Sequence, residues 1–459
     1  MARGRKKENL TPEERLQAAL VPENEQPYKV PENWCWVRLG AITKIIGGGT
    51  PSSKISDYYK NGTIPWLSPA DLSGYTDIYI SHGNKNITEL GFKNSSAQML
   101  PMNTVCLSSR APIGYVVIAA NSLCTNQGFK SFLPSASYIP QYLYWYLKGN
   151  KPLLESYASG TTFLELSASK AGLVEFSLAP LTEQQRIVNR IESLFAKLDE
   201  AKQKALATLD SFETRKAAIL HKAFTGELTA KWRKEHGVGM ESWETKKYSE
   251  ICNIVRGGSP RPAGSPEFYG GNIPFMKVAD ITRNAGPYVN STEYTIKEAG
   301  LKKTRMVDRN TLLLTNSGAT LGVPAICTFK TTFNDGIAAF LGLNPDTLLF
   351  HYYFWTSKTA DLRAINKGAA QPNLNTDIIG NVEINLPRES EQREIVRILD
   401  DLLAKEQQAK EAAEKVLEQI DLIKKSILAR AFRGELGTND PSEESAAELL
   451  RQVLSTSDM

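Results

Sequence analysis

Two long stretches of the chain carry mostly apolar residues at spacings that alternate between four and three. In the first stretch these positions are Ile187, Ile191, Leu194, Leu198, Ala201, Ala205, Thr208, Phe212, Arg215 and Ile219. In the second they are Ile395, Leu399, Leu402, Glu406, Ala409, Ala413, Val416, Ile420, Ile423 and Ile427. A sustained mean spacing of about 3.5 residues is typical of a coiled-coil seam. The pattern therefore predicts two helices of about 40 residues, each roughly 60 Å long.

Outside these stretches the apolar residues come in short runs separated by turn signals. The runs TVCLSS and GYVVIAA, and later TLLLTNS and GVPAICTF, are rich in β-branched residues and predict strands. Each region also contains one aromatic stretch with helical spacing, at 138–149 and 347–358. We therefore predict a mixed α/β fold class, with each globular region built on a strongly bent sheet.

The second half of the chain repeats the first. TEQQRIVNRI (182–191) matches SEQREIVRIL (390–399), and KAAILHKAFTGEL (216–228) matches KKSILARAFRGEL (424–436), both at an offset of 208. In the globular regions GGGTP matches RGGSP, GTIPWLSPADL matches GNIPFMKVADI, and TNQGF faces FNDGI. The intervening segments differ almost completely. A period this long indicates duplication of a whole domain together with its helix.

The repeat sets the expected domain organisation. It comprises an N-terminal leader, a first domain, a first helical region, a linker, a second domain, a second helical region and an acidic tail, at 1–32, 33–180, 181–229, 230–242, 243–388, 389–436 and 437–459. Two helices of equal length and register can pair as an antiparallel coiled coil. The domains would then be related by a pseudo-twofold axis. The alternative is that each helix packs on its own domain as an ordinary amphipathic helix.

Composition narrows the class of protein. A hydrophobic content of 41% is that of a globular chain, and no apolar run approaches the ~18 residues of a spanning helix. The basic N-terminus has no apolar segment behind it, so no secretory signal is expected. The five cysteines form no CxxC pair, which favours reduced thiols in a cytoplasmic protein and no metal site. A net charge of +4 permits a polyanionic partner without requiring one.

Catalytic motifs are not found in the sequence. There is no phosphate-binding GxxxxGK[ST], no GxGxxG after a strand, no Asn-Pro-Pro-aromatic segment, and no GxSxG or HExxH. The segments GGGTP and RGGSP fit tight turns better than anion sites. Trp66, Trp145 and Trp355 could stack on bases, but a core position is the more ordinary interpretation.

Basic residues are concentrated in the loop-rich parts of both domains. Such residues supply sequence-independent affinity for phosphates, although a solvated basic surface explains them about as well. The candidate DNA contacts are Lys54, Lys60, Lys85, Arg110, Arg256, Arg261, Lys277, Arg283, Lys302 and Lys303.

The combination of two divergent domains, each followed by a helix that opens on EQ-x-x-IV and closes on AF-x-GEL, resembles the specificity subunit of type I restriction-modification enzymes (the HsdS family). WVRLGAI and WETKKYSEI also look like the starts of that family's target-recognition domains. The resemblance covers about 33–436. It implies a non-catalytic subunit that binds a bipartite, asymmetric site in double-stranded DNA, with the paired helices setting the spacer between the halves.

The resemblance also implies partners. Two methylation subunits would bind S-adenosylmethionine and modify adenine, and restriction subunits would use ATP and magnesium, so this chain itself would hold no cofactor. The repeated helix ends are candidate partner-binding surfaces, with residues Glu183, Gln184, Phe224, Glu391, Gln392 and Phe432. Gly226 and Gly434 are expected to let the chain leave each helix. The competing hypothesis is a non-catalytic coiled-coil scaffold with two protein-binding ends.

Overall fold

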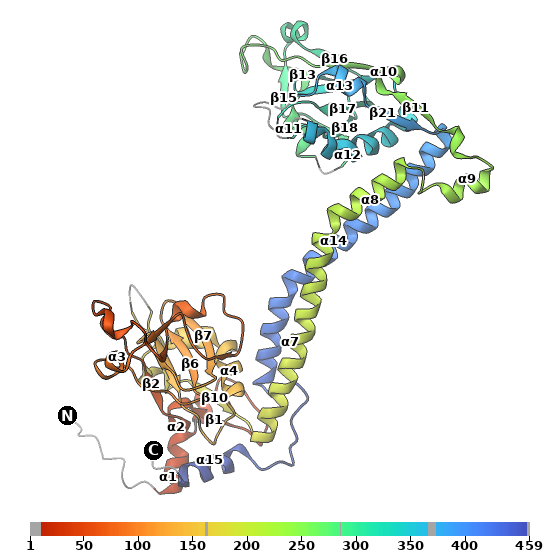
Figure 1. Cartoon of the computed structure of the whole chain (residues 1–459). Coiled ribbons are helices and arrows are strands. Elements are labelled where there is room, and N and C mark those ends of the chain that lie inside the picture. The colour runs from red at the N-terminus through yellow and green to blue at the C-terminus, as the bar shows by residue number, and fades with distance from the viewer. Residues whose placement is uncertain (1–10, 161–163, 285, 319, 366–372, 457–459) are drawn as a thin grey trace. The chain divides into compact units, whose positions relative to one another are not determined.

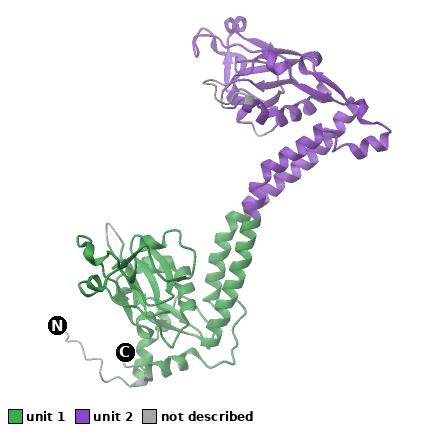
Figure 2. Cartoon of the chain, viewed as in Figure 1, with its two compact units in different colours: residues 1–204, 416–459 green, residues 205–415 purple. Residues whose placement is uncertain are grey.

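The computed structural model describes residues 11–160, 164–284, 286–318, 320–365 and 373–456. The chain divides into two compact units (Figure 2): unit 1 combines residues 1–204 with 416–459, and unit 2 is residues 205–415. Each unit contains one mixed α/β domain and a segment in which two helices run side by side (Figure 1). The predicted fold class is thereby confirmed for both copies.

The domain of unit 1 is built on two sheets and a short two-stranded ribbon. The five-stranded sheet has the order β2-β9-β6-β7-β4, the three-stranded sheet β5-β3-β8, and the ribbon pairs β1 with β10. The strands are β1 Cys35–Arg38, β2 Ile45–Gly47, β3 Ile64–Leu67, β4 Tyr79–Ile80, β5 Lys85–Ile87, β6 Val105–Ser109, β7 Ile113–Ala119, β8 Cys124–Thr125, β9 Phe129–Phe132 and β10 Glu175–Leu178.

The helices of unit 1 lie around the ribbon and both sheets. They are α1 Pro12–Ala19, α2 Leu39–Ile42, α3 Glu89–Lys93, α4 Pro140–Gly149, α5 Lys151–Tyr157, α6 Ala168–Ala171, the greater part of α7 Leu181–Asp210, the C-terminal part of α14 Glu389–Ala431, and α15 Ala446–Thr456. The aromatic stretch predicted as a helix is α4, and six consecutive residues of it are buried. Short 3-10 turns lie at Glu23–Glu25, Ser56–Tyr58 and Pro69–Leu72.

The domain of unit 2 repeats this topology. Its five-stranded sheet has the order β12-β20-β17-β18-β14, its second sheet β15-β13-β19-β16, and its ribbon pairs β11 with β21. The strands are β11 Glu244–Lys247, β12 Asn253–Arg256, β13 Tyr269–Met276, β14 Tyr288–Val289, β15 Tyr294–Ile296, β16 Arg305–Val307, β17 Thr311–Thr315, β18 Pro324–Cys327, β19 Thr331–Phe333, β20 Ile337–Leu341 and β21 Glu383–Leu386.

The helices of unit 2 follow the same plan, with a longer aromatic helix. They are α8 Phe212–Phe224, α9 Ala230–His236, α10 Tyr248–Ile251, α11 Val278–Thr282, α12 Leu348–Ile365, α13 Thr376–Gly380 and the N-terminal part of α14. Short 3-10 segments lie at Met240–Ser242, Glu298–Lys303 and Pro345–Thr347. Trp66, Trp145 and Trp355 are at most 7% exposed, so the core interpretation of these tryptophans is confirmed.

The long helices differ in one respect from the prediction. The second is continuous over 43 residues, whereas the first breaks at Ser211 into α7, of 30 residues, and α8, of 13 residues. The Ser211 hydroxyl donates to the Ala207 carbonyl, a contact that commonly bends a helix. Within unit 1, Lys424 on α14 forms a 2.6 Å ion pair with Asp199 on α7. Within unit 2, Arg215 on α8 forms a 2.7 Å ion pair with Glu406 on α14.

The predicted seam of α14 is wrong at three positions. Ala409, Val416 and Ile423 are exposed, and the half-buried positions are instead Lys410, Leu417 and Lys424. An α-helix has 3.6 residues per turn, so a strict seven-residue repeat falls behind the buried face by about 20° per heptad. From Ala409, two heptads after Ile395, the next residue along this row is the less exposed one, whereas Ala413 and Ile420 of the other row stay buried. Lys410 and Lys424 accordingly lie over the rings of Phe212 and Phe195, each 5.0 Å from the centroid.

The glycine pairs of GGGTP and RGGSP lie where two backbone segments cross closely. The sequence had suggested tight turns or anion sites, and neither describes such a crossing. A Cβ on Gly48 would lie 2.1 Å from the Asn126 carbonyl oxygen, and one on Gly257 would lie 2.2 Å from that of Asn334. The amide N–H groups of Gly257 and Gly258 donate to backbone carbonyls. Because these donors are used internally, the anion-site interpretation does not hold at RGGSP. The crossings bring the following Thr or Ser against the TNQGF and FNDGI loops.

The leader and the tail both belong to the core of unit 1 where they are described. Leu16 and Ala19 of α1 pack in one cluster with Ala446, Leu450 and Leu454 of α15. Leu20 bridges Val37, and the Val21 amide donates to the Trp36 carbonyl, so the leader continues the ribbon at β1. The sequence offered no role for these segments, because neither has a counterpart in the repeat.

Candidate nucleic-acid interface

In unit 1, three segments meet at one end of the larger sheet, and we call this the loop edge of the unit. They are the crossing at Thr50, the loop between β8 and β9, and the chain after β6. The Thr50 hydroxyl donates to Oε1 of Gln127, and the Ser109 amide donates to the Gly128 carbonyl at 2.7 Å. Thr50 and Gln127 are exposed. The loop edge therefore presents exposed polar side chains on a backbone that is held by a hydrogen bond from Ser109, the last residue of β6.

A buried lysine supports this edge. Lys130 of β9 is 8% exposed, and its Nζ donates to the Ser109 hydroxyl at 3.1 Å and to the Gln127 carbonyl at 3.4 Å. Burial lowers the pKa of Lys130, and Glu165 at 3.6 Å opposes that shift. Glu165 also lies 3.4 Å from Arg110. Two cations and one carboxylate thus leave the loop edge with excess positive charge.

Unit 2 has an equivalent loop edge built from different side chains. The Ser259 hydroxyl donates to Oδ1 of Asp335 at 2.6 Å, and Nε of Arg256 donates to the Asp335 carbonyl at 2.6 Å. Arg261 is exposed and lies 3.8 Å from Oδ2 of Asp335. The Asn316 amide donates to the Gly336 carbonyl, as Ser109 does to Gly128 in unit 1. Ala338 occupies the position of Lys130.

A carboxylate holds the neighbouring loop in both units. Oδ2 of Asp71 accepts from the Ser68 amide and its Oδ1 from the Asn84 amide. Asp280 accepts from the amides of Lys277 and Glu293 in the same way. This shared support explains why the PADL and VADI segments match although the loops they hold differ. Backbone amide donors help hold the pKa of Asp71 below its usual value although burial opposes them.

The predicted DNA contacts fall into two groups. The structure brings Arg256 and Arg261 together at the loop edge of unit 2 and places Arg110 at that of unit 1. Others lie elsewhere on the domains: Lys85 is on β5, Arg283 pairs with Glu293 at 2.8 Å, and Lys277 lies over the Tyr294 ring at 3.2 Å. The remaining exposed lysines of the prediction are Lys54, Lys60, Lys302 and Lys303. The DNA-contacting role of all ten stays a prediction.

Sequence reasoning missed the polar residues of the loop edges. Charge alone does not single out Thr50, Gln127, Ser259 or Asp335, because three of them are neutral and the fourth is acidic. The available signal was the match between TNQGF and FNDGI, which preserves the turn while changing the side chain at its centre.

The predicted partner-binding residues lie at two junctions, where each helix end meets the start of the other helix. In unit 1, Glu183 is fully buried and accepts from the Thr438 hydroxyl at 2.6 Å and from Arg186, which also binds Glu443. Burial raises the pKa of Glu183, and the hydrogen bonds from Thr438 and Arg186 oppose that shift. Gly434 leaves the helix with a φ of 74°.

In unit 2 the equivalent carboxylate, Glu391, has different donors. It is 1% exposed and accepts from the Thr229 hydroxyl at 2.7 Å, from Arg233 at 2.7 Å and from the Trp243 indole at 3.0 Å. Arg233 lies on α9, inside the segment expected as a linker, and is itself buried. Gly226 has a φ of 82° and ends the preceding helix as expected.

The other predicted partner residues also make contacts within their own unit. Gln184 is buried, and its side chain donates to the carbonyls of Ser137 and Ala179. Phe432 is 1% exposed and packs edge-on against Tyr142 and Tyr146. Gln392 is 4% exposed and donates to the Pro387 carbonyl. Of the six residues, Phe224 alone is more than 9% exposed. The partner role stays a prediction.

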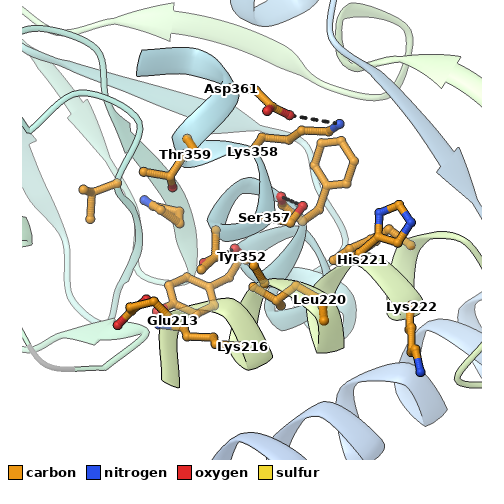
Figure 3. Close-up of a pocket in the computed structure, with 18 of the residues that line it drawn as sticks. Glu213, Lys216, Leu220, His221, Lys222, Tyr352, Ser357, Lys358, Thr359 and Asp361 are labelled. Atoms are coloured by element: carbon orange, nitrogen blue, oxygen red, sulfur yellow. Dashed lines mark hydrogen bonds and ion pairs between the residues drawn. The ribbon is translucent and has the colours of Figure 1, made fainter. Parts of the chain in front are cut away.

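Phe224 lines a groove in unit 2. This groove, of about 1160 Å³, runs between α8 and α12 (Figure 3). Its labelled side chains include Lys216, His221 and Lys222 from α8, with the ion pair of Lys358 and Asp361 on α12. Its walls combine charged heads with aromatic and aliphatic surface.

Two further absences hold for the part of the chain that the structure describes. None of its helices is both long and apolar enough to cross a membrane. It contains no group of three or more His, Cys, Asp or Glu side chains arranged to hold a metal ion.

This architecture, two copies of one α/β domain each followed by a long helix, is that of a DNA specificity subunit. The family model described as type I restriction modification DNA specificity domain matches residues 31–209 and again 240–419. The chain therefore belongs to the family of type I restriction enzyme specificity subunits, whose members recognise DNA and are not catalytic.

Individual relatives agree with this assignment. The MjaIX specificity subunit of Methanocaldococcus jannaschii is 34% identical over 304 residues, which is 64% of this chain and 68% of the relative. The EcoKI specificity subunit of Escherichia coli K12 is 23% identical and aligns over 93% of this chain and 96% of its own length. The crystal structure of the HsdS subunit from Thermoanaerobacter tengcongensis has the same fold, with a TM-score of 0.66 at 20% identity over 90% of this chain and 100% of that one.

Proposed function

We propose that each domain reads one half of a bipartite, asymmetric site in double-stranded DNA, and that the loop edges face the DNA. The observation that carries this proposal is the contrast within the repeat. The two domains share strand order, glycine crossings and loop supports, yet they present different side chains at the same positions of the loop edge. A fold kept constant under a changing polar edge suits two readers of different sequences.

Positive charge at both edges supports the DNA assignment. Arg110 with Lys130 in unit 1, and Arg256 with Arg261 in unit 2, lie next to the residues that the loops expose. Arg110 and Arg261, whose side chains are 36% and 72% exposed, would contact phosphates and fix the register, while neighbouring polar groups would contact bases. We place this activity in the cytoplasm.

The salt dependence of binding distinguishes DNA recognition from the scaffold hypothesis. Binding to a duplex that contains the site should weaken steeply as salt is raised, because each neutralised phosphate releases counterions. The measurement is fluorescence anisotropy of the complex with a labelled duplex between 50 and 200 mM salt, ranges in which several phosphate contacts change affinity by about 10³-fold or more. A flat salt profile would favour the scaffold.

We also propose that the two junctions each recruit one methylation subunit. These partners would bind S-adenosylmethionine and methylate adenine, and restriction subunits using ATP and magnesium would join through them. The equivalence of the two junctions, each closed on a buried glutamate, supports a pair of identical partners. The paired helices would set the spacer between the half-sites.

Phe224 provides a direct test of this partner role. Phe224 is partly exposed but also packs edge-on against Phe350 and Phe354. In Phe224→Ala protein that remains folded, one of two bound methylation subunits should be lost, as measured by mass photometry of the assembled complex. The neighbouring exposed Lys222→Ala is the matched control and should retain both. If Phe224→Ala binds two subunits with unchanged affinity, the residue serves only to pack the helix end.

A further inference from the structure

One residue in each loop edge is held by the same two kinds of contact, although the contacting residues differ. Gln127 and Asp335 occupy equivalent positions at the centres of TNQGF and FNDGI. Each accepts a hydrogen bond at its side chain from the hydroxyl that follows the glycine crossing, Thr50 in one case and Ser259 in the other. The loop position is therefore organised identically in two domains whose surrounding sequence has diverged.

The backbone carbonyl of this residue is also held by a cation in both units. Lys130 reaches the Gln127 carbonyl from β9, whereas Arg256 reaches the Asp335 carbonyl from β12. These cations do not occupy equivalent positions in the repeat, since Ala338 stands where Lys130 does and Gly47 where Arg256 does. Cations from different positions thus bind the same backbone carbonyl in the two units. This indicates that the orientation of the residue at the position of Gln127 and Asp335 matters.

Each of these two side chains has a second polar atom that does not bond to the hydroxyl, and this atom is a donor in one unit and an acceptor in the other. With Oε1 of Gln127 accepting from Thr50, the remaining atom is Nε2, a donor, and no described residue accepts a hydrogen bond from it. With Oδ1 of Asp335 bonded to Ser259, the other carboxylate oxygen is Oδ2, an acceptor that forms a 3.8 Å ion pair with the exposed Arg261. The two edges thus present opposite hydrogen-bonding characters at one position.

We propose that Gln127 and Asp335 are specificity-determining residues that contact base edges from equivalent loops. This inference rests on the proposed reading of DNA by the loop edges. Asp335 selects a base that carries an exocyclic amino group, cytosine or adenine, because a carboxylate oxygen accepts from it. Gln127 selects a base that presents an acceptor in the major groove through its free amide N–H. The hydroxyl holds the side chain and the cation holds the backbone carbonyl before DNA binds, which reduces the entropy lost on binding.

The experiment uses the whole chain in complex with its methylation subunit and a duplex library randomised over the recognised site. Bound duplexes are sequenced for the wild-type chain, Asp335→Asn and Gln127→Glu. Asp335→Asn keeps the shape of the side chain but adds a donor, so discrimination should fall by about 10-fold at one base pair of one half-site. Gln127→Glu should change one base pair of the other half-site. Separate effects in separate halves are the expected result.

Asp308→Asn is the matched control. Asp308 also forms a 3.8 Å ion pair, with Lys330. It lies before the first residue of β17, whereas Thr315 at the other end of this strand pairs with Ile337 beside the loop edge. This control should leave every base preference unchanged. Ser259→Ala retains the Asp335 carboxylate without its support and should lower discrimination at the same base pair as Asp335→Asn, which guards against a folding defect in any one variant.

The possible outcomes distinguish a failure of the proposed function from a failure of the assignment of Gln127 and Asp335. If the wild-type complex shows no sequence preference, the proposed function fails. If the wild type is specific while folded Asp335→Asn and Gln127→Glu keep all base preferences, the assignment of these two residues is overturned and the loop edges read DNA elsewhere. A loss of affinity that is uniform over all sequences would likewise overturn it, since that is the signature of a phosphate contact.

Discussion

The ribbons of the two units differ in what lies along their outer strand. In unit 1 that strand reads CWVR, its two central residues are buried, and the leader and the tail cover it with α1 and α15. In unit 2 it reads ETKK and is largely exposed. Charged side chains, lysine above all, protect an open strand edge from pairing with other chains. The same fold thus tolerates an open edge or a covered one, provided that the sequence of the strand matches.

The junction glutamates show a second difference. Glu391 is paired with an arginine whose side chain is 9% exposed, whereas Glu183 is paired with Arg186, which is 38% exposed and has Glu443 as a second partner. Unit 2 has therefore buried a complete ion pair, and unit 1 has left part of its network in solvent. Buried pairs are costly to break because the remaining charge stays desolvated.

The largest expected effect follows from this contrast. Glu391→Ala leaves Arg233 buried without a counter-charge and should destabilise unit 2 by about 3–5 kcal/mol. Glu183→Ala should cost only about 1–2 kcal/mol, because Arg186 keeps Glu443. Hydrogen exchange of the amides near each junction measures both effects locally. Equal losses at the two junctions would contradict the comparison.

The next largest loss of stability is expected from truncating a buried side chain of α15, which covers the ribbon of unit 1. Leu450 of α15 is fully buried, so Leu450→Ala should cost about 3 kcal/mol through lost burial and a cavity. Leu422→Ala on α14 is the control, since Leu422 is 65% exposed and should cost little. Thermal unfolding followed by tryptophan fluorescence reports the change, because Trp34 lies in the same cluster. Equal melting temperatures for Leu450→Ala and wild type would show that the terminal helices are dispensable.

The core of unit 2 contains a buried histidine, and this predicts a pH effect in that unit. His351 is buried where Leu143 stands in unit 1, its Nδ1 lies 3.0 Å from the Tyr248 hydroxyl, and burial lowers its pKa to about 4. The unfolded state takes up a proton near pH 6.5 that the folded state refuses until about pH 4. Stability is therefore full above pH 7, is lost as pH falls, and should drop by about 2 kcal/mol by pH 5.

The matched variant removes this dependence. His351→Leu combined with Tyr248→Phe imports the apolar character of unit 1 and leaves no unpaired hydroxyl. Urea unfolding at pH 7 and pH 5 should show the loss for unit 2 of the wild type and a smaller one for the double variant. A pH dependence of the same size in both chains would assign the effect to other groups.

The smallest expected effect concerns the face of α14. Val416→Ala should change stability by less than about 0.5 kcal/mol, because an exposed side chain loses little on truncation. Ile420→Ala, four residues away and 3% exposed, should cost about 2–4 kcal/mol. Similar costs at the two positions would restore the seam that the heptad pattern predicts.

The sequence predicted much of the fold and little of the site, for physical reasons. Repeats, apolar runs and glycine at helix ends depend on local periodicity and backbone sterics, so the two domains, α4, α12 and the ends at Gly226 and Gly434 could be predicted. The face of α14 could not, because the drift of about 20° per heptad accumulates over many turns.

The loop edges and the terminal helices were beyond such reasoning. Gln127 and Asp335 owe their positions to the hydroxyls of Thr50 and Ser259, which lie more than 70 residues away in the chain, and α15 acquires its partner α1 across almost the whole sequence. Counting positive charges did identify Arg110, Arg256 and Arg261, which lie at the edges. It missed Lys130, the cation that supports the loop, because a single lysine in an apolar strand carries no pattern.

The central claim is that each domain reads its own half of one DNA site. The most direct measurement replaces residues 33–180 with the corresponding domain of another specificity subunit and maps methylated adenines in DNA from cells that also express the methylation subunit. If each domain reads its own half, one half of the methylated site should change while the other half and the spacer stay the same. A change in both halves, or in neither, would contradict it.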